Sequence, residues 1–306
     1  MNAEFDFLYK QLCSFIPSSR LFLNANLSKY TSFKIGGNAN IMVMPSDIRE
    51  LNIICILCKK IGIRFYVLGR GTNVLVLDSG INGVVIKTDK LQTVKISGTY
   101  ITAEAGASIQ EIVNIALDNN FSGLEWACGI PGSVGGAVYM NAGAYGGQMS
   151  DIVKSVKVYD NGKATIISNQ NAQFDYRHSI FEEKKYQHCV ILSTILKLKK
   201  DEQKNIQNRI TEFTLKRKQT QNVGYPNAGS AFKKPKEGYA AKFIEDAGLK
   251  GITFGGAAVS NVHSGFIVNL GNATCSDVAN LMDYISSTVY KKFNVVLIPE
   301  IKIFGG

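Results

Sequence analysis

Apolar residues recur at helical spacing in five stretches of the chain. The clearest stretch runs from Cys275 to Phe293, with apolar residues on one face. Two others start with a helix signal, Ser46 as an N-cap and the capping-box pattern of Ser108 and Glu111. The predicted helices span residues 47–61, 109–119, 202–218, 239–247 and 275–293.

Shorter apolar or alternating runs predict strands between these helices. Thr31 to Ala39 is interpreted as a short strand and a glycine turn that lead into a second strand. Asp160-Asn161-Gly162 is a strong turn signal that joins two strands in a hairpin. Strands are predicted at 41–44, 64–68, 74–77, 84–88, 93–97, 100–104, 152–159, 164–168, 190–198, 265–270 and 295–303. They follow no regular βαβ rhythm, so the predicted fold class is α+β.

The composition indicates a globular protein with a sizeable core. The chain has 306 residues, which suits two domains or one core domain with a smaller partner, and 45 % of them are hydrophobic. No apolar run reaches the roughly 18 residues of a membrane span. Residues 1–16 lack the basic start and apolar block of a secretion signal. We therefore expect a cytoplasmic protein without a membrane partner.

The formal net charge of +10 raises the question of nucleic acid. Lys and Arg are dispersed, however, and their densest groups, at 197–200 and 216–218, lie near the ends of one predicted helix. No aromatic-studded RNA-binding motif accompanies them. The charge instead suits an enzyme whose ligands carry several phosphates, and no nucleic-acid partner is expected.

The six cysteines are scattered and do not form a disulfide framework. Cys55 and Cys58 make a C-x-x-C inside an apolar helical pattern, which favours buried thiols over a redox or metal site. A zinc site would need a second pair of ligands, and His188 adjoins only the lone Cys189. No metal is expected.

Glycine is concentrated at residues 129–147, where seven of nineteen residues are glycine. Glycine destabilises helices and strands, so this density points to a backbone that passes close to a ligand with its N–H groups turned inward. A flexible surface loop is the alternative. Ile130, Val134 and Met140 place apolar anchors among the glycines, whereas a flexible linker would carry serine and charge. A nest for a phosphate or an electron-rich ring is therefore predicted.

A second glycine turn, Gly69-Arg70-Gly71-Thr72-Asn73, follows the predicted strand at 64–68. It can offer backbone and side-chain donors to a pyrophosphate, although a plain β-turn explains it equally well. A strand follows it, so it is not the dinucleotide-binding G-x-G-x-x-G motif, which opens a helix. It also lacks the G-K-[ST] ending of a P-loop.

Six short motifs occur in order along the chain. They are Tyr30-Thr31-Ser32-Phe33-x-Ile35-Gly36-Gly37, Leu68-Gly69-x-Gly71-Thr72-Asn73, Gly129-Ile130-Pro131-Gly132-Ser133-Val134-Gly135-Gly136-Ala137, Tyr176-Arg177, Gly229-Ser230-x-Phe232-Lys233 and Pro299-Glu300-Ile301. Each is modestly specific alone. In this order they resemble the UDP-N-acetylenolpyruvoylglucosamine reductase (MurB) family of flavoenzymes, over about residues 26–305.

The resemblance implies a two-subdomain FAD-binding fold of the vanillyl-alcohol-oxidase type, followed by a C-terminal α+β substrate domain. The implied ranges are 1–90 and 91–200 for the FAD-binding subdomains and 201–306 for the substrate domain. The final strand, within 295–306, is expected to return to the first subdomain.

The resemblance also implies that two loops hold FAD by its pyrophosphate and flavin. No histidine precedes His178, so the FAD is expected to be non-covalent. The implied cofactor-binding residues are Gly69, Arg70, Gly71, Thr72, Asn73, Gly129, Ile130, Pro131, Gly132, Ser133, Gly135, Gly136 and Ala137.

The implied reaction belongs to peptidoglycan precursor synthesis. NADPH gives a hydride to the flavin, which passes it to the alkene of UDP-N-acetylglucosamine enolpyruvate, and the product is UDP-N-acetylmuramate. By resemblance Arg177 and Glu300 meet the charge on the substrate carboxylate, and Ser230 donates the proton. Tyr176, Arg177, Lys233 and Lys234 are implied substrate contacts, and a monomer is expected. From sequence alone Arg177 is compatible with a surface arginine, Ser230 with a loop hydroxyl and Glu300 with a strand-end charge.

Three departures from the family pattern concern the substrate site. Lys234 stands where the family usually has Asn, and Gln221-Asn222 where it usually has Gln-Pro. Arg177 and Ser230 lie 53 positions apart (230 − 177), which leaves no room for the tyrosine-bearing lid of the long family form. Ser260 and His263, in another family-like segment, are assigned structural roles.

Two rival functions stay open. One is an FAD-dependent oxidase of the same fold that acts on a sugar or alcohol, against which the absent early histidine argues. The other is a non-enzymatic nucleotide-binding protein that has kept the scaffold.

Overall fold

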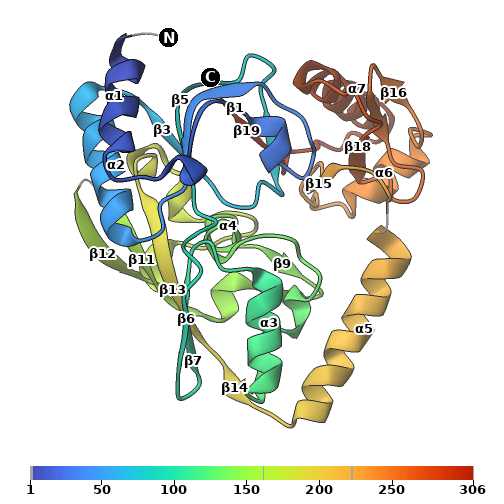
Figure 1. Ribbon diagram of the computed structural model, residues 1–306. Coiled ribbons are helices and arrows are strands. Elements are labelled where there is room, and N and C mark those ends of the chain that lie inside the picture. Colours follow the sequence, from blue (N-terminus) through green and yellow to red (C-terminus); the bar gives the residue numbers. More distant parts are fainter. Residues whose placement is uncertain (1–2, 161, 222, 306) are drawn as a thin grey trace. The chain divides into compact units, whose positions relative to one another are not determined.

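The computed structural model describes residues 3–160, 162–221 and 223–305 (Figure 1). The chain forms two compact units. The first unit contains the described residues up to Leu23 together with Ile41–Arg70 and Gly83–Arg217. The second unit contains Asn24–Asn40, Gly71–Asn82 and the described residues from Lys218 onward. These units cut across the ranges 1–90, 91–200 and 201–306, and that three-part division stays a prediction.

Seven helices are present in the described chain: α1 (Ala3–Cys13), α2 (Ile48–Ile61), α3 (Ile109–Asp118), α4 (Val134–Tyr139), α5 (Gln203–Gln221), α6 (Ala240–Asp246) and α7 (Cys275–Phe293). All five predicted helices are therefore confirmed. The sequence reasoning missed α1 and α4. None of these helices is long and apolar enough to cross a membrane.

One predicted helix cap is wrong, and a second is confirmed in position but not in its side-chain bond. The N-cap of α2 is Asp47, whose carboxylate accepts from the N–H groups of Arg49 and Glu50, and not Ser46. Ser108 is the N-cap of α3, but its side chain makes no capping bond within the described chain. The Ile109 N–H instead donates to the Gly132 carbonyl, so a tertiary contact replaces part of the local cap.

The first unit contains a five-stranded antiparallel sheet, in the order β12-β11-β13-β7-β6 (Figure 1). Its strands are β6 (Val94–Ser97), β7 (Tyr100–Glu104), β11 (Val153–Asp160), β12 (Lys163–Ser168) and β13 (Val190–Lys197). The hairpin of β11 and β12 is confirmed, although Asn161 in its turn lies outside the described residues. Buried apolar residues of α3 and α4 pack with those of the sheet in one core.

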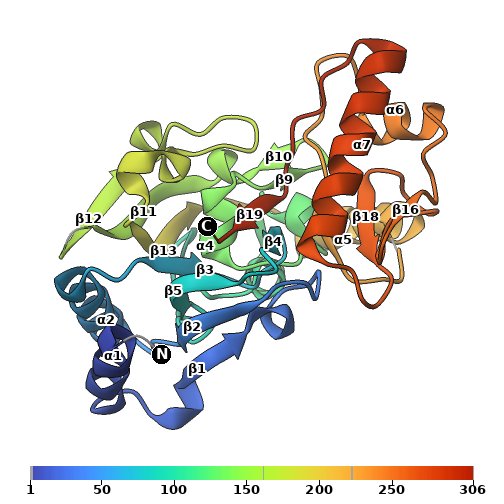
Figure 2. The same cartoon turned by 90° about the horizontal axis from the view of Figure 1, so that it is seen from above.

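A four-stranded sheet has the order β1-β2-β5-β3. Its strands are β1 (Leu21–Asn26), β2 (Asn38–Val43), β5 (Ile81–Lys87) and β3 (Phe65–Leu68). The boundaries between the two units fall inside β1, β2 and β5. In the first unit α1 and α2 share a core with β2 and β5 (Figure 2). The strand predicted within 31–37 is not formed, because these described residues follow a short 3-10 helix without strand pairing.

The second unit contains the antiparallel sheet β15-β18-β17-β16. Its strands are β15 (Asn227–Ser230), β16 (Thr253–Phe254), β17 (Ala257–Val259) and β18 (Phe266–Asn269), and α6 and α7 pack on them in one core (Figure 2). β4 (Val74–Val76) pairs in parallel with β19 (Lys302–Phe304). The strand predicted at 295–303 is therefore too long, because regular pairing occurs only at 302–304.

Four two-residue strands complete the described fold: β8 (Phe121–Ser122), β9 (Gly143–Ala144), β10 (Gly147–Gln148) and β14 (Lys199–Lys200). β9 pairs with β10, and β8 with β14. Cys55 and Cys58 are buried reduced thiols in α2, and burial raises the pKa of each. The described residues contain no cluster of three metal-ligating side chains.

Candidate functional site

The two glycine loops meet at Gly69 and Ser133 in the first unit. A β-carbon built on Gly69 would collide with Ser133 Oγ, so a larger residue at 69 would force the Ser133 hydroxyl to move. Ser133 is buried and caps α4 by accepting from the Gly136 N–H at 3.4 Å. The structure thus brings together residues that lie 64 positions apart (133 − 69) and that were both predicted to bind the cofactor.

Some glycines of the long stretch are needed for packing within the protein. Gly135 and Gly136 belong to α4, and a β-carbon on Gly135 would lie 2.8 Å from that of Ala105. A β-carbon on Gly147 would collide with the ring of Trp126. The stretch is therefore not one continuous nest, and its glycine density has two causes.

The hydrogen bonds of the backbone N–H groups show which residues of the stretch are available to bind an anion. Val134 and Gly135 donate to the carbonyls of Ala107 and Ala105, both at 2.9 Å. Gly132 and Ser133 have no recorded acceptor for their N–H groups within residues 3–160, 162–221 and 223–305. Backbone N–H groups in such a turn can bind an anion. Gly132 and Ser133 are thus the part of the stretch that fits a phosphate.

A buried lysine supports the first glycine turn. Lys87 Nζ donates to the Gly69 carbonyl at 2.9 Å and forms an ion pair with Asp89 at 2.8 Å. Burial lowers the pKa of Lys87, the nearby Arg70 acts in the same direction, and Asp89 opposes both. The sequence reasoning missed Lys87, whose only signal was a lysine inside an apolar strand.

The rest of the first glycine turn belongs to the second unit. Gly71 has φ +65°, and a β-carbon there would collide with the Tyr30 carbonyl. The Asn73 side chain donates to the Glu300 carbonyl at 3.2 Å, and the Lys302 N–H donates to the Asn73 carbonyl at 3.0 Å. The structure therefore joins a predicted cofactor-binding residue to a predicted catalytic one.

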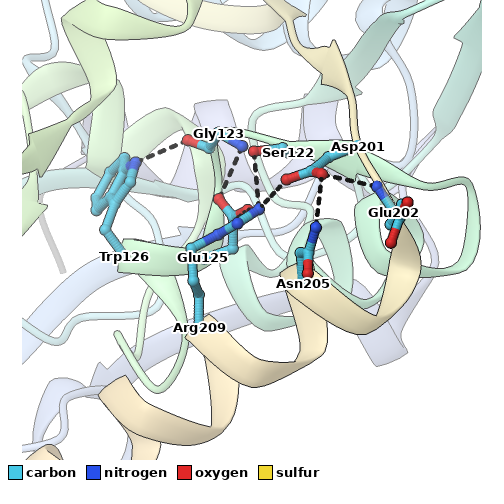
Figure 3. Close-up of polar contacts among 8 residues, drawn as sticks. All are labelled: Ser122, Gly123, Glu125, Trp126, Asp201, Glu202, Asn205 and Arg209. Carbon is cyan, nitrogen blue, oxygen red and sulfur yellow. Dashed lines mark hydrogen bonds and ion pairs between the residues drawn. The ribbon is translucent and has the colours of Figure 1, made fainter.

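The segment before the long glycine stretch is fixed to α5 by charge (Figure 3). The buried Glu125 carboxylate accepts from Arg209 Nε at 3.0 Å and Nη2 at 2.7 Å, and from the Gly123 N–H at 2.7 Å. Arg209 Nη2 also contacts Asp201. Burial alone would raise the pKa of Glu125, but these hydrogen bonds lower it overall.

Arg177 lies in a tight turn in which Asp175 and His178 exchange two backbone hydrogen bonds, each 3.1 Å long. Its φ of +52° is uncommon for a residue with a side chain. Its guanidinium donates through Nη2 to the Gly143 carbonyl at 2.6 Å. The guanidinium carbon lies over the exposed Tyr176 ring, 5.1 Å from the ring centroid. An arginine whose guanidinium is held in one orientation next to an exposed tyrosine suits the binding of an anion.

Ser230 and Glu300 are joined through the main chain of the second unit. Residues 231–233 and 298–300 run antiparallel, with the Glu300 N–H donating to Ala231 at 2.9 Å and the Lys233 N–H to Ile298 at 2.8 Å. Ser230 also pairs with Phe266 in the sheet. The serine and the glutamate, 70 positions apart (300 − 230), are therefore neighbours, and both are half-buried.

A β-bulge lies directly before Ser230. Three steps along β15, from Asn227 to Ser230, match two steps along β18, from Val268 to Phe266. Gly229 has φ +78°, which a glycine adopts without strain. Bulges re-aim side chains and occur often next to active sites, so the bulge fits a functional Ser230.

The remaining predicted contacts lie near these residues in sequence. Lys233 joins the ladder just described, and Lys234 Nζ lies over the ring of the exposed Tyr239 at 4.5 Å. Ser260 Oγ accepts from the N–H groups of Val262 and His263, which agrees with the structural roles assigned to Ser260 and His263.

Comparison with known proteins identifies the class first. Residues 39–168 match the family model of an FAD binding domain. The fold is also shared with an alkyldihydroxyacetonephosphate synthase, at a TM-score of 0.50 and 13 % identity over 64 % of this chain and 40 % of that one. The protein is thus an α+β protein with an FAD-binding domain.

The family is shown by closer relatives. Residues 221–304 match the C-terminal domain model of UDP-N-acetylenolpyruvoylglucosamine reductase. The reductase of Caldanaerobacter subterraneus subsp. tengcongensis is 46 % identical over 98 % of this chain and 99 % of its own length, and that of Clostridium botulinum is 42 % identical over 100 % and 99 %. The crystal structure of the reductase (MurB) from Thermus caldophilus matches with a TM-score of 0.79 and 32 % identity, over 93 % of this chain and 98 % of that one. The chain belongs to the UDP-N-acetylenolpyruvoylglucosamine reductase family.

Proposed function

We propose that this protein reduces UDP-N-acetylglucosamine enolpyruvate to UDP-N-acetylmuramate in peptidoglycan precursor synthesis, with NADPH as the hydride donor and FAD as the cofactor. The observation that carries the proposal is the 46 % identity to a named reductase over 98 % of the chain. The contacts that join several of the six motifs are consistent with it.

The residues present fit FAD. Gly69 and Ser133 approach each other closely, Gly132 and Ser133 offer backbone N–H groups, and Arg70 and Lys87 add positive charge near the same turn. These features suit a pyrophosphate. These residues would hold FAD, which would supply hydride transfer from NADPH to the substrate alkene. The first histidine in the chain is His178, which lies 3.4 Å from Glu182 rather than in either glycine loop, so we propose non-covalent binding.

Three side chains are proposed to act on the substrate. Hydride addition beside a carboxylate builds negative charge on the carboxylate oxygens, and preorganised positive or proton-donating groups stabilise that charge. The planar fork of Arg177 matches a carboxylate. Glu300 is proposed as a second hydrogen-bond donor, a role that requires its protonated form. Ser230 donates the proton to carbon.

Other proposed features concern binding and assembly. Tyr176, Lys233 and Lys234 are proposed substrate contacts, since one is an exposed aromatic ring and two are cations suited to a diphosphate. Gly71, Thr72, Asn73, Gly129, Ile130, Pro131, Gly135, Gly136 and Ala137 are proposed to complete the FAD site with the residues named above. We propose a cytoplasmic monomer, to be tested by sedimentation of the purified protein.

A two-stage experiment tests the function. The purified protein is loaded with FAD, mixed with NADPH under anaerobic conditions, and then mixed with the enolpyruvyl substrate. We expect the flavin absorbance to fall in the first stage and to return in the second, with UDP-N-acetylmuramate as the product by mass spectrometry. Reduction without reoxidation by this substrate would refute the proposal.

The rival functions give different results in the same apparatus. Oxygen consumption with a sugar or alcohol and no NADPH would favour the oxidase. A protein that stays colourless after FAD is added would favour a non-enzymatic nucleotide-binding role.

A further inference from the structure

The turn that carries Arg177 is held by one short segment, Tyr139–Gly143, in the first unit. The Tyr139 carbonyl accepts from Ser179 Oγ at 2.6 Å, after the turn. The Gly143 carbonyl accepts from Arg177 Nη2 at 2.6 Å, at the turn itself. The segment therefore accepts hydrogen bonds from side chains at the turn and just after it.

Asn141 provides the central contact. Its Nδ2 donates to the Asp175 carbonyl at 2.9 Å and to Gln148 Oε1 at 3.2 Å, and its Oδ1 accepts from the Ser150 N–H at 2.9 Å. The side chain is fully buried, and its own φ is +43°. An amide that satisfies its donors and acceptor in a buried place fixes the groups around it.

The segment also begins where α4 ends. α4 follows directly from Gly132 and Ser133, the proposed phosphate-binding part of the glycine stretch. Only the six residues of α4 separate Ser133 from Met140, which precedes Asn141. Through α4, Asn141 therefore links the backbone of the Arg177 turn to the proposed phosphate-binding residues.

We propose that Asn141 is a positioning residue, which holds the Arg177 turn at a fixed place relative to the FAD loop so that the guanidinium meets the substrate carboxylate. The proposal rests on the proposed function above. It predicts that Asn141 matters for the substrate half of the reaction and not for reduction of the flavin by NADPH. A purely structural asparagine would affect both halves alike.

The test variant is Asn141→Asp. It keeps the size of the side chain and the acceptor for the Ser150 N–H, but replaces the donor to Asp175 by an oxygen. We expect FAD content and the rate of reduction by NADPH to stay within about 3-fold of wild type. Reoxidation by the enolpyruvyl substrate should slow by about 10- to 100-fold, as a misplaced catalytic geometry does.

Asn169→Asp is the matched control. Asn169 Nδ2 donates to the carbonyls of Ser150 and Val153 at 2.8 Å and 2.7 Å, so this variant also loses backbone bonds near the segment, but it does not touch the Arg177 turn. We expect a comparable fall in melting temperature with no difference between the two half-reactions. If Asn169→Asp also slowed reoxidation more than reduction, and by the same factor as Asn141→Asp, a specific role for Asn141 would be contradicted.

A double-mutant cycle measures whether Asn141 acts through Arg177. On an Arg177→Ala background, Asn141→Asp should add less than about 3-fold, because the group that it positions is gone. Calorimetric titration of the oxidised protein with the substrate gives a second readout, and both single variants should weaken binding. If the rate losses of Asn141→Asp and Arg177→Ala multiply fully in the double variant, the proposal is overturned.

Ser179→Ala decides the question if Asn141→Asp does not fold. It removes the bond from Ser179 Oγ to Tyr139 and so releases the turn from its other side. Reoxidation by the substrate should slow by about 3- to 10-fold, while reduction by NADPH stays unchanged. Equal slowing of both half-reactions would refute positioning by this segment. If the substrate does not reoxidise the wild-type protein, the proposed function is refuted instead. Failure of the proposed function is thus distinguished from failure of the role proposed for Asn141.

Discussion

The turn that carries Arg177 and the strand that carries Ser230 hold their proposed catalytic side chains by different means. The Arg177 turn has a strained backbone and is fixed by the side chains of Asn141 and Ser179. Ser230 lies between main-chain ladders to residues 265–266 and, through Ala231, to Glu300. Its neighbour Gly229 adopts its left-handed conformation without strain.

The difference predicts how each region responds to mutation. A main-chain ladder survives the loss of almost any single side chain, so substitutions around Ser230 should separate chemistry from stability. A turn held by buried side-chain hydrogen bonds loses its geometry when one partner is removed, because an unsatisfied group is costly. Four substitutions, from the largest expected effect to the smallest, test this contrast.

Ser230→Ala should give the largest loss of activity. The proposed proton donor is removed, and general acid catalysis typically contributes about 10²–10⁴-fold. Reduction by NADPH should be unchanged, and reoxidation by the substrate should slow by that factor in stopped-flow absorbance. Because the main chain holds the strand, the melting temperature should hardly move. Reoxidation near the wild-type rate would remove Ser230 from the mechanism.

Arg177→Lys should be the next most severe. The lysine keeps the positive charge but loses the fork and the bond to the Gly143 carbonyl. A hydrogen bond to a charged group contributes about 1.5–3 kcal/mol, so the substrate half should slow by about 10- to 100-fold. Stopped-flow reoxidation checks this value, with reduction by NADPH as the internal control. An unchanged rate would leave Arg177 as a structural residue.

Arg209→Gln tests another contact held by side chains. Glu125 is buried, while Arg209 is partly exposed, so the loss at pH 7 should be about 1–2 kcal/mol of unfolding free energy after solvent screening. The pKa of Glu125 is lowered in the folded protein. The stabilisation is therefore full above the unfolded pKa of about 4.3 and is lost as the pH falls through the lower folded pKa.

Urea unfolding of wild type and Arg209→Gln between pH 7 and pH 3 measures this dependence. The difference between the two proteins should shrink on the acid side. A difference that stays constant across the whole range would show that packing of the Arg209 stem, and not its charge, holds α5.

Gly229→Ala should destabilise the protein less than Arg209→Gln does. A β-carbon there meets no atom of the described residues within 4 Å, so the cost is the left-handed backbone alone, about 1 kcal/mol. Gly224→Ala is the matched control, since Gly224 has φ +71° and is equally open. Both should lower the melting temperature alike, but only Gly229→Ala should slow turnover, because it re-aims Ser230. Equal turnover in both variants would argue that the bulge has no role in catalysis.

Helices and strands could be predicted where the sequence pattern that specifies them is local. The apolar periodicity of 275–293 predicts α7 with its observed bounds. α4 escaped detection because Gly135 and Gly136 lower helix propensity, while contacts to the carbonyls of Ala105 and Ala107 fix the helix from outside. The side-chain capping bond expected at Ser108 is absent for a related reason. The first N–H of the helix donates instead to the carbonyl of Gly132, 24 positions from Ser108 (132 − 108).

The candidate site was reached by resemblance and not by periodicity. No local pattern links Ser230 to Glu300 or Gly69 to Ser133, because their proximity depends on pairings between distant segments. Asn141 and Lys87 were missed for the same reason. Each looks like an ordinary polar residue until its buried partners are known, and those partners come from turns or strands elsewhere in the chain.

The parallel pairing of β4 with β19 has a consequence for synthesis of the chain. Val76 and Lys302 are separated by 226 residues (302 − 76), so β4 emerges from the ribosome long before its partner exists. At about 5–20 residues per second this interval is roughly 11–45 seconds. During that time the apolar residues of β4, such as the buried Leu75, stay uncovered. Nascent chains of this protein are therefore expected to need protection from aggregation until translation has passed Phe304. The proposed catalytic residue Glu300 is put in place by the same late event.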